Sequence, residues 1–242
     1  MRVAVISDVH ANLHALDVVL EEIDADPPDA LWCVGDVVGY GARPNECCTI
    51  VEERADLCLG GNHDLAVRGT IDLADFAGEA GAAARWTRTV LTDGALAFLQ
   101  TLEPQAHAGD VALFHGSARD PVWEYVLSDE AAVTTFLRTK EDLILVGHSH
   151  VALQVVLRKA LLDGGLAPDG TELELTGARW LLNPGSVGQP RDGDPRAAYL
   201  RLDLDAGRAS FHRVEYDIEQ TQAEIRAAGL PELLASRLAL GL

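Results

Sequence analysis

Residues 3–10, VAVISDVH, decide the fold, because an apolar run typical of a strand leads directly into an Asp-x-His pair. Four later apolar runs end in a similar way, in Gly-Asp, Gly-Gly-Asn-His-Asp, His-Gly and Gly-His-x-His. We predict strands over residues 3–6, 31–34, 57–59, 111–114 and 143–146. Ligands of α/β sheets bind outside the carboxyl ends of the strands, so we expect the five endings to converge on one place.

The residue types at these endings favour a metal centre. Carboxylates and imidazoles without a thiolate suit Mn, Fe or Zn better than a structural soft-metal site. The five endings hold too many candidate ligands for one tetrahedral ion and enough for two ions that share a bridging carboxylate. On an extended backbone, the spacing of two residues points Asp8 and His10 to the same side, and His148 and His150 repeat this arrangement.

The remaining pattern predicts the fold class. Up to residue 150, strands alternate with helical segments, and after it five strands are predicted over residues 152–158, 171–176, 179–182, 198–204 and 208–214. Two terminal helices follow, over 219–228 and 231–240. We therefore expect a four-layer α/β/β/α sandwich of two mixed sheets with helices outside, formed as a single domain over residues 1–242.

Composition excludes several classes of protein. The 242 residues carry 19 Lys and Arg against 38 Asp and Glu, a net charge of −19. This negative charge argues against a surface that binds nucleic acid or anionic lipid by charge alone. No apolar stretch is long enough for a membrane span, and the four cysteines read as reduced thiols. We expect a cytoplasmic protein.

The ordered motifs resemble a known family. In this order, Asp8-x-His10, Gly35-Asp36, Gly61-Asn62-His63-Asp64, His115 and Gly147-His148-x-His150 match the calcineurin-like metallophosphoesterases. The stretches HGS (115–117) and NPGSVGQPR (183–191) also look like bacterial members related to the small phosphodiesterases. Five ordered blocks are far more specific than a lone Gly-Asn-His-Asp.

The resemblance implies a role for each of these residues. One metal would be held by Asp8, His10, Asp36 and His150, and the other by Asp36, Asn62, His115 and His148, with Asp36 bridging. His63 would act as general acid at the leaving-group oxygen, oriented by Asp64. A hydroxide shared by two divalent ions (Mn, Fe, Zn or Co) would attack phosphorus, while the metals neutralise charge on the phosphoryl oxygens.

Departures from the family pattern bear on the substrate. Protein phosphatases and symmetrical diadenosine tetraphosphate hydrolases carry an arginine soon after the Gly-Asp block, whereas here Arg43 is displaced along the chain. Arg119 and Arg191 follow motif-bearing segments and are the candidate contacts to substrate phosphate, since arginine offers a bidentate fork. The alternative is that they only pair with Asp120 and Asp192.

We therefore expect a metal-dependent phosphoesterase that acts on a small phosphodiester or phosphomonoester. The two-histidine last block resembles the phosphodiesterase and nuclease branches more than the protein-phosphatase branch. A protein or dinucleoside-polyphosphate phosphatase is the alternative within the enzyme class. The net charge disfavours a nuclease acting on long nucleic acid. Outside the enzyme class, the alternative is a metal- or nucleotide-binding protein without turnover. The complete ligand set counts against this alternative.

Overall fold

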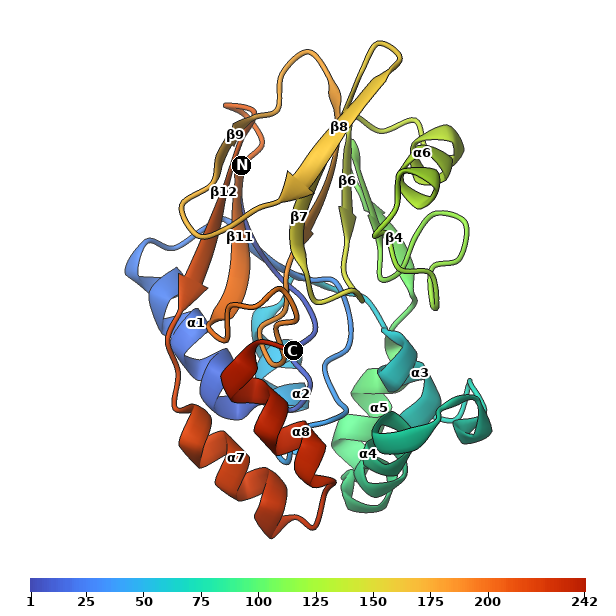
Figure 1. The fold of residues 1–242 in the computed structure, drawn as a ribbon, viewed down its shortest axis with the longest axis vertical. Coiled ribbons are helices and arrows are strands. Elements are labelled where there is room, and N and C mark those ends of the chain that lie inside the picture. The colour runs from blue at the N-terminus through green and yellow to red at the C-terminus, as the bar shows by residue number, and fades with distance from the viewer.

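Two six-stranded sheets form the centre of the molecule (Figure 1). The computed structural model describes residues 1–242. The first sheet contains, in spatial order, β3 (Leu57–Cys58), β2 (Ala30–Cys33), β1 (Arg2–Ile6), β11 (Ala197–Asp203), β12 (Arg208–Val214) and β9 (Glu172–Glu174). The second contains β4 (Gln105–Ala108), β5 (Val111–Phe114), β6 (Leu143–Val146), β10 (Arg179–Pro184), β7 (Ala152–Arg158) and β8 (Leu161–Leu166).

Both sheets are mixed. In the first sheet, β1, β2 and β3 pair in parallel, and β11 joins β1 antiparallel. In the second sheet, β5, β6 and β10 are parallel, and β7 joins β10 antiparallel. The parallel strands of each sheet therefore send their carboxyl ends to one edge, where the polar motifs begin.

Most helices connect these strands, and the last two follow the final strand. They are α1 (Leu13–Ala25), α2 (Pro44–Arg54), α3 (Asn62–Val67), α4 (Gly78–Val90), α5 (Asp93–Thr101), α6 (Asp129–Arg138), α7 (Ile218–Ala227) and α8 (Glu232–Ser236), with short 3-10 turns η1 (Leu73–Asp75) and η2 (Arg237–Leu240). Local chemistry fixes their starts. The side chain of Asn12 accepts a hydrogen bond from the amide of Ala15, and Pro44 occupies the first turn of α2. No helix combines the length and the apolar character that crossing a membrane requires.

Apolar side chains divide the molecule into four layers. Val5 and Leu200 of the first sheet and Leu145 and Leu182 of the second are buried in one cluster between the sheets. The other face of the first sheet packs against α1, α2 and α5. The other face of the second sheet packs against α6 through Phe136. The predicted α/β/β/α order of two mixed sheets with helices outside is confirmed.

Three elements escaped the sequence analysis, and each lacks a periodic apolar signal. Strand β4 has the sequence QAHA, and the edge strand β8 carries two consecutive glycines. Helix α3 has only six residues and begins inside the Asn-His-Asp motif. The helix predicted over 231–240 divides into α8 and η2, and the strand predicted over 171–176 shrinks to β9.

The contact between α6 and the second sheet gives a direct test of the layer order. Phe136 is 1% exposed in this contact, whereas the next residue, Leu137, is 80% exposed. We predict that Phe136→Ala lowers the free energy of unfolding by about 3–5 kcal/mol because it leaves a cavity. Leu137→Ala changes it by less than about 0.5 kcal/mol. Urea unfolding of both variants measures the difference, and equal losses would contradict the layer order.

Candidate metal centre

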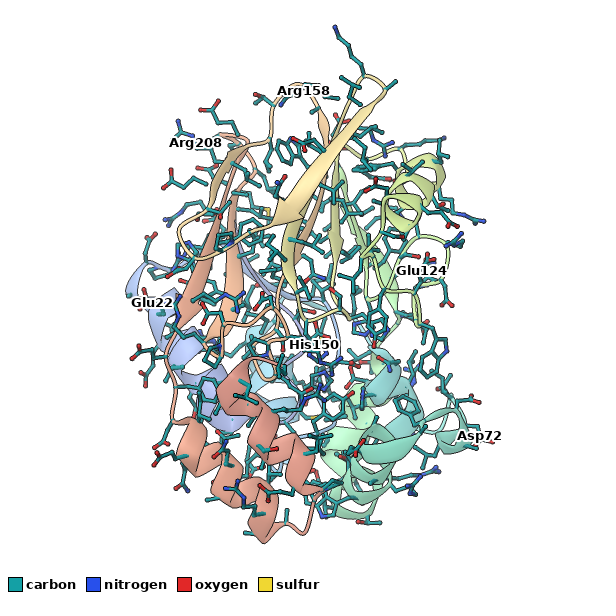
Figure 2. The ribbon with its side chains drawn as sticks, viewed as in Figure 1. Glu22, Asp72, Glu124, His150, Arg158 and Arg208 are labelled. Carbon is teal, nitrogen blue, oxygen red and sulfur yellow. The ribbon has the colours of Figure 1, made fainter.

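The strand endings meet in one buried cluster of carboxylates and imidazoles. Two groups of side chains have ligand atoms within 4.8 Å of one another: Asp8, His10, Asp36 and His150 in one, and Asp36, His115 and His148 in the other. Asp36 belongs to both groups. Figure 2 places His150 where the lower ends of the strands meet the helices. The side-chain oxygen of Asn62 lies 3.2 Å from His115 Nε2, which brings Asn62 to the second group.

Short distances around Asp36 define the geometry of the cluster. Its Oδ2 atom lies 3.5 Å from His10 Nε2 and 3.5 Å from His115 Nε2. In the group that contains Asp8, His150 Nε2 lies 3.4 Å from Asp8 Oδ1. Neither Asp36 Oδ2 nor Asp8 Oδ1 has a hydrogen-bond partner, although both atoms are buried. Two buried carboxylate oxygens without donors point to a missing positive charge between them.

The imidazoles are oriented as metal ligands are. Nδ1 of His10 lies 3.0 Å from the carbonyl of Val38, and Nδ1 of His150 lies 2.6 Å from the carbonyl of Gln189. A carbonyl only accepts hydrogen bonds, so each Nδ1 is the donor and each Nε2 of a neutral ring carries a lone pair. These two Nε2 atoms lie 3.0 Å apart. A cation bound by both nitrogens would satisfy the facing lone pairs, and carbonyl partners of this kind orient metal-bound histidines.

His115 and His148 follow the same rule on the other side of the cluster. His115 Nδ1 lies 2.9 Å from the carbonyl of Val34. His148 is reversed, with Nε2 lying 3.2 Å from the carbonyl of Trp123, which leaves its Nδ1 as the free nitrogen. The donor set of carboxylates, imidazoles and one amide fits divalent Mn, Fe, Zn or Co.

The backbone at the cluster is left-handed, which corrects one expectation. The φ angle is +53° at Asp8, +49° at His10, +64° at His148 and +58° at His150. The predicted extended spacing of the two pairs is therefore wrong. Each such residue costs about 1–3 kcal/mol, and the surrounding structure must hold it there. Hydrogen bonds do so: the amides of Asp8 and His10 donate to the carbonyls of Gly35 and Asp36, at 2.9 Å each.

Burial and neighbouring charge set the protonation of the cluster. Burial raises the pKa of Asp8 to about 7. Burial alone would also raise the pKa of Asp36, but the imidazoles of His115, His63 and His10 hold it below its usual value. Burial lowers the pKa of His148 to about 3 and that of His10 well below its usual value. These two rings are therefore neutral at pH 7, as metal ligation requires. At His115, burial lowers the pKa but the carboxylate of Asp36 outweighs it and raises the pKa to about 9, so metal binding there would release a proton.

His63 adjoins the cluster without entering either group. Its ring lies edge-on to that of His10, with centroids 5.0 Å apart, and 4.4 Å from the ring of Tyr40. Burial lowers the pKa of His63 to about 4. Its Nδ1 atom is buried without a hydrogen-bond partner. The backbone amide of His63 donates to Asp36 Oδ1 at 2.9 Å, so the position of His63 depends on the shared carboxylate.

Asp64 does not hydrogen-bond to His63, contrary to expectation. Its carboxylate accepts hydrogen bonds from three backbone amides, those of Val37, Val38 and Gly61, at 2.9–3.1 Å. Asp64 therefore ties the loop after β2 to the start of α3. It positions Asp36 and His63 through the backbone.

The two candidate phosphate contacts differ in environment. The guanidinium of Arg119 pairs with Glu124 and Glu130. Arg191 lies with its Cζ 5.5 Å from the centre of the Tyr40 ring, and its amide donates to the carbonyl of His150. Its Nε atom is buried without a hydrogen-bond partner. The alternative pairings with Asp120 and Asp192 are not formed, since Asp192 pairs with Arg213.

Sequence reasoning missed Tyr40 and Arg237. Tyr40 contacts His10, His63 and Arg191. Its backbone has a φ of +58°, and the only sign of this in the sequence is the glycine that precedes it. Burial, followed by the charge of Arg191, lowers the pKa of Arg237. The next residue, Leu238, lines a small cavity with His10 and Tyr40. The only sequence signal for Arg237 was its place in the predicted terminal helix.

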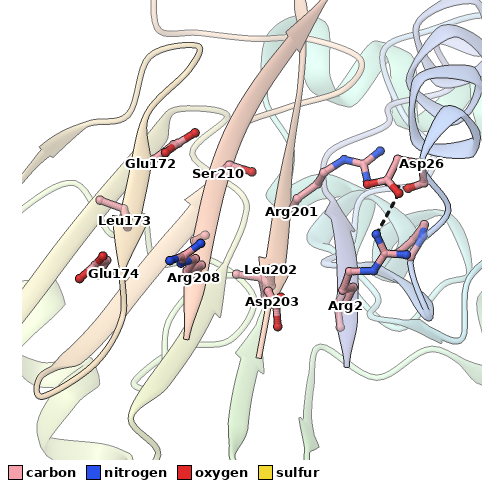
Figure 3. A pocket seen from close by; sticks show the side chains of 13 residues that line it. Arg2, Asp26, Glu172, Leu173, Glu174, Arg201, Leu202, Asp203, Arg208 and Ser210 are labelled. Carbon is pink, nitrogen blue, oxygen red and sulfur yellow. Dashed lines mark hydrogen bonds and ion pairs between the residues drawn. The ribbon is translucent and has the colours of Figure 1, made fainter. Parts of the chain in front are cut away.

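A separate surface hollow lies far from the cluster along β1. It has a volume of about 520 Å³ and lies beside the end of α1, over β1, β11, β12 and β9. Figure 3 shows the ion pair of Arg2 with Asp26 at one end of its lining. Arg201 also binds the carbonyl of Asp26. Two of its arginines are thus engaged within the chain, and none of the cluster ligands lines it.

A two-sheet sandwich with a buried Asp/His cluster at its strand ends defines a metal-binding α/β protein. Residues 1–207 match the family model described as the calcineurin-like phosphoesterase superfamily domain, and the chain belongs to this superfamily. It is 37% identical over 246 residues to an uncharacterised protein of Methanocaldococcus jannaschii, covering 99% of this chain and 98% of that protein.

Solved structures agree with this assignment. A metallophosphoesterase from Sphaerobacter thermophilus is 43% identical and superposes with a TM-score of 0.90, covering 100% of this chain and 99% of that one. A hypothetical protein from Pyrococcus horikoshii, 18% identical, shares the fold with a TM-score of 0.80 over 100% of this chain and 98% of its own.

A single glycine tests whether the cluster depends on close packing around Asp36. A Cβ atom at Gly61 would lie 2.0 Å from Asp36 Oδ1. The backbone of Gly61, with φ of −87° and ψ of 177°, would itself suit alanine. We predict that Gly61→Ala displaces the carboxylate and lowers the bound metal per chain, measured by plasma mass spectrometry. Gly94→Ala, where no atom lies within 4 Å, is the matched control and keeps the wild-type metal content. Unchanged metal in Gly61→Ala would contradict the geometry.

Proposed function

We propose that the protein is a binuclear-metal phosphoesterase that hydrolyses a phosphodiester or phosphomonoester of a small molecule. The observation that carries the proposal is the sharing of Asp36 between two groups of ligand atoms, with His63 against His10 and hydrogen-bonded through its amide to Asp36. A carboxylate between two ligand groups is the arrangement that two metals acting on one phosphoryl group require. Membership of the superfamily supports the reaction class.

Each group has a role in this proposal. Asp8, His10, Asp36 and His150 would hold one ion, and Asp36, Asn62, His115 and His148 the other. When bound, the two divalent cations would supply activation of water and neutralise charge on the phosphoryl oxygens. His63 would donate a proton to the leaving-group oxygen, which departs as the alcohol. The negative charge of a bound phosphate would raise the pKa of this ring from the low value that burial gives it, so that it carries the proton in the complex. Arg191 would bind the non-bridging oxygens.

The C-terminal helices support one further part of the proposal, a single domain over residues 1–242. Ile225 of α7 and Leu234 of α8 are buried with Ala83 of α4, in one apolar cluster. The hydroxyl of Thr221 donates to the side chain of Asn12 at 3.2 Å. Residues beyond the family match at 207 therefore pack on elements within it.

A dinucleoside-polyphosphate phosphatase is the second candidate. Over 75 residues, the chain is 35% identical to a symmetrical bis(5′-nucleosyl)-tetraphosphatase of Actinobacillus pleuropneumoniae, covering 29% of this chain and 27% of that protein. The displaced Arg43 counts against it, because its guanidinium pairs with Glu46 and Glu224. Release of nucleotide from diadenosine tetraphosphate, measured beside chromogenic phosphodiesters and phosphomonoesters, distinguishes the two.

Two substitutions separate proton donation from metal binding. We predict that His63→Ala keeps the metal content and lowers kcat on bis(para-nitrophenyl) phosphate by about 10²–10⁴-fold. Asp36→Asn loses metal from both groups, because the shared carboxylate is weakened. The exposed Asp17 serves as control, and Asp17→Asn should change neither quantity. Full kcat in His63→Ala would show that the proposed proton donor is wrong.

Arg191 and Arg119 give contrasting predictions for phosphate binding. We predict that Arg191→Ala raises the inhibition constant of inorganic phosphate about 10- to 100-fold, the effect of losing a charge-assisted hydrogen bond. Arg119→Ala leaves it unchanged, because that guanidinium is held by Glu124 and Glu130. Steady-state inhibition kinetics on the metal-loaded protein measures both constants. The reverse order would reassign the phosphate contact to Arg119.

A further inference from the structure

A row of aromatic side chains leads from the metal centre to the surface, and the reaction proposed above uses none of them. Phe76 lies against His63, with ring centroids 4.9 Å apart, and Trp123 lies against Phe76 at 5.2 Å. Tyr125 stacks on His148 at 4.2 Å, with an angle of 9° between the rings. Phe76 is buried, whereas Trp123 is 39% and Tyr125 47% exposed. Large exposed aromatic groups beside a site of this kind are typical of ligand contacts.

The loop that carries Trp123 and Tyr125 is built to hold them. It connects β5 to α6 and descends toward α3 in Figure 1. Asp120 Oδ1 accepts hydrogen bonds from the amides of Val122 and Trp123, at 3.1 and 3.0 Å. Glu124 is held by Ser117 and Arg119.

The same loop is also tied to the cluster, because the carbonyl of Trp123 lies 3.2 Å from His148 Nε2. Arg119 binds Glu124 of this loop, so its role here is to hold the loop in place. The two exposed rings are therefore presented at a fixed place relative to the proposed ligand His148.

We propose that Trp123 and Tyr125 form an aromatic platform that selects phosphate esters of nucleosides, with the base stacked on Trp123. The proposal rests on the proposed phosphoesterase function, since it places the phosphate at the metal centre. A base offers a flat face to an aromatic ring whatever its hydrogen-bonding edge, so the platform accepts several bases.

The position of Trp123 argues for a base and against a simple aryl ester. Trp123 lies two ring contacts away from His63, the proposed donor to the leaving-group oxygen, with Phe76 between them. A ring bonded directly to the ester oxygen stays beside His63 and Phe76. A base is separated from that oxygen by a sugar, and this spacer brings it to Trp123. The net charge of −19 agrees with a small nucleotide better than with a long nucleic acid.

Three ligands that share a phosphate group test the platform by calorimetry on the metal-loaded protein. Every protein titrated, including the one with the wild-type Trp123, carries His63→Ala, so that these phosphomonoesters are bound and not hydrolysed. Adenosine 5′-monophosphate has a base and a spacer, ribose 5-phosphate has the spacer alone, and phenyl phosphate has a ring without the spacer. We expect the protein that keeps Trp123 to bind the nucleotide more tightly than the sugar phosphate. Trp123→Ala should weaken nucleotide binding about 5- to 150-fold, the range of stacking on an aromatic side chain. Binding of the other two ligands should stay within about twofold.

Two variants control for damage to the fold or the metal centre. Trp123→Phe keeps a ring and should retain most of the preference for the nucleotide. Leu127→Ala removes an exposed apolar side chain from the same loop and should leave all three affinities unchanged. Thermal melting and metal content are measured for each variant.

The outcomes distinguish the platform from the proposed function. A selective loss for the nucleotide in Trp123→Ala supports the platform, even if no phosphate ester is hydrolysed and the proposed function fails. Equal weakening of all three ligands, or equal affinity of the protein that keeps Trp123 for nucleotide and sugar phosphate, overturns the platform while hydrolysis of other esters can still stand. A loss confined to phenyl phosphate also overturns it, because the platform would then select aryl esters.

Discussion

The carboxylate of Asp36 is the constraint on which the site depends. It is buried, its Oδ2 atom has no hydrogen-bond partner, and imidazoles approach it from both sides at 3.5 Å. A buried negative charge is costly unless cations or donors compensate it. Its other oxygen holds the amide of His63, so one side chain positions both ligand groups and the proposed proton donor. Gly61 approaches this carboxylate so closely that a Cβ atom there would lie 2.0 Å from Asp36 Oδ1.

The sheets supply the rigidity that this arrangement needs. Left-handed backbone at Asp8, His10, Asp36, His148 and His150 is unfavourable, and it follows strands that are buried on both faces. Packing between the sheets and under the helices stabilises the strands. The unfavourable left-handed residues lie at the ends of these strands and are held there by them. Backbone carbonyls then fix the orientation of the imidazoles. Holding the ligands in place before any ion binds therefore offsets part of the free energy that stabilises the fold.

Much of this was predictable from sequence, because the ligand types sit at strand endings that periodicity reveals. The layer order, most elements and the ligand groups around Asp36 follow from that pattern together with the family resemblance. The left-handed backbone at Asp8 and the amide contacts of Asp64 could not be predicted, since both depend on loops meeting in three dimensions. Arg119 was misleading for the same reason: its partner Glu124 stands in a turn that no periodicity reveals. Tyr40 and Trp123 carry no motif, and only the fold brings them to the cluster.

Anomalous diffraction from crystals of the protein loaded with Mn tests the central claim most directly. The account predicts two peaks about 3.5–4 Å apart, with the carboxylate of Asp36 between them. His10 and His150 should contact one peak, and His115 and His148 the other. A single peak, or two peaks that do not share Asp36, would contradict it.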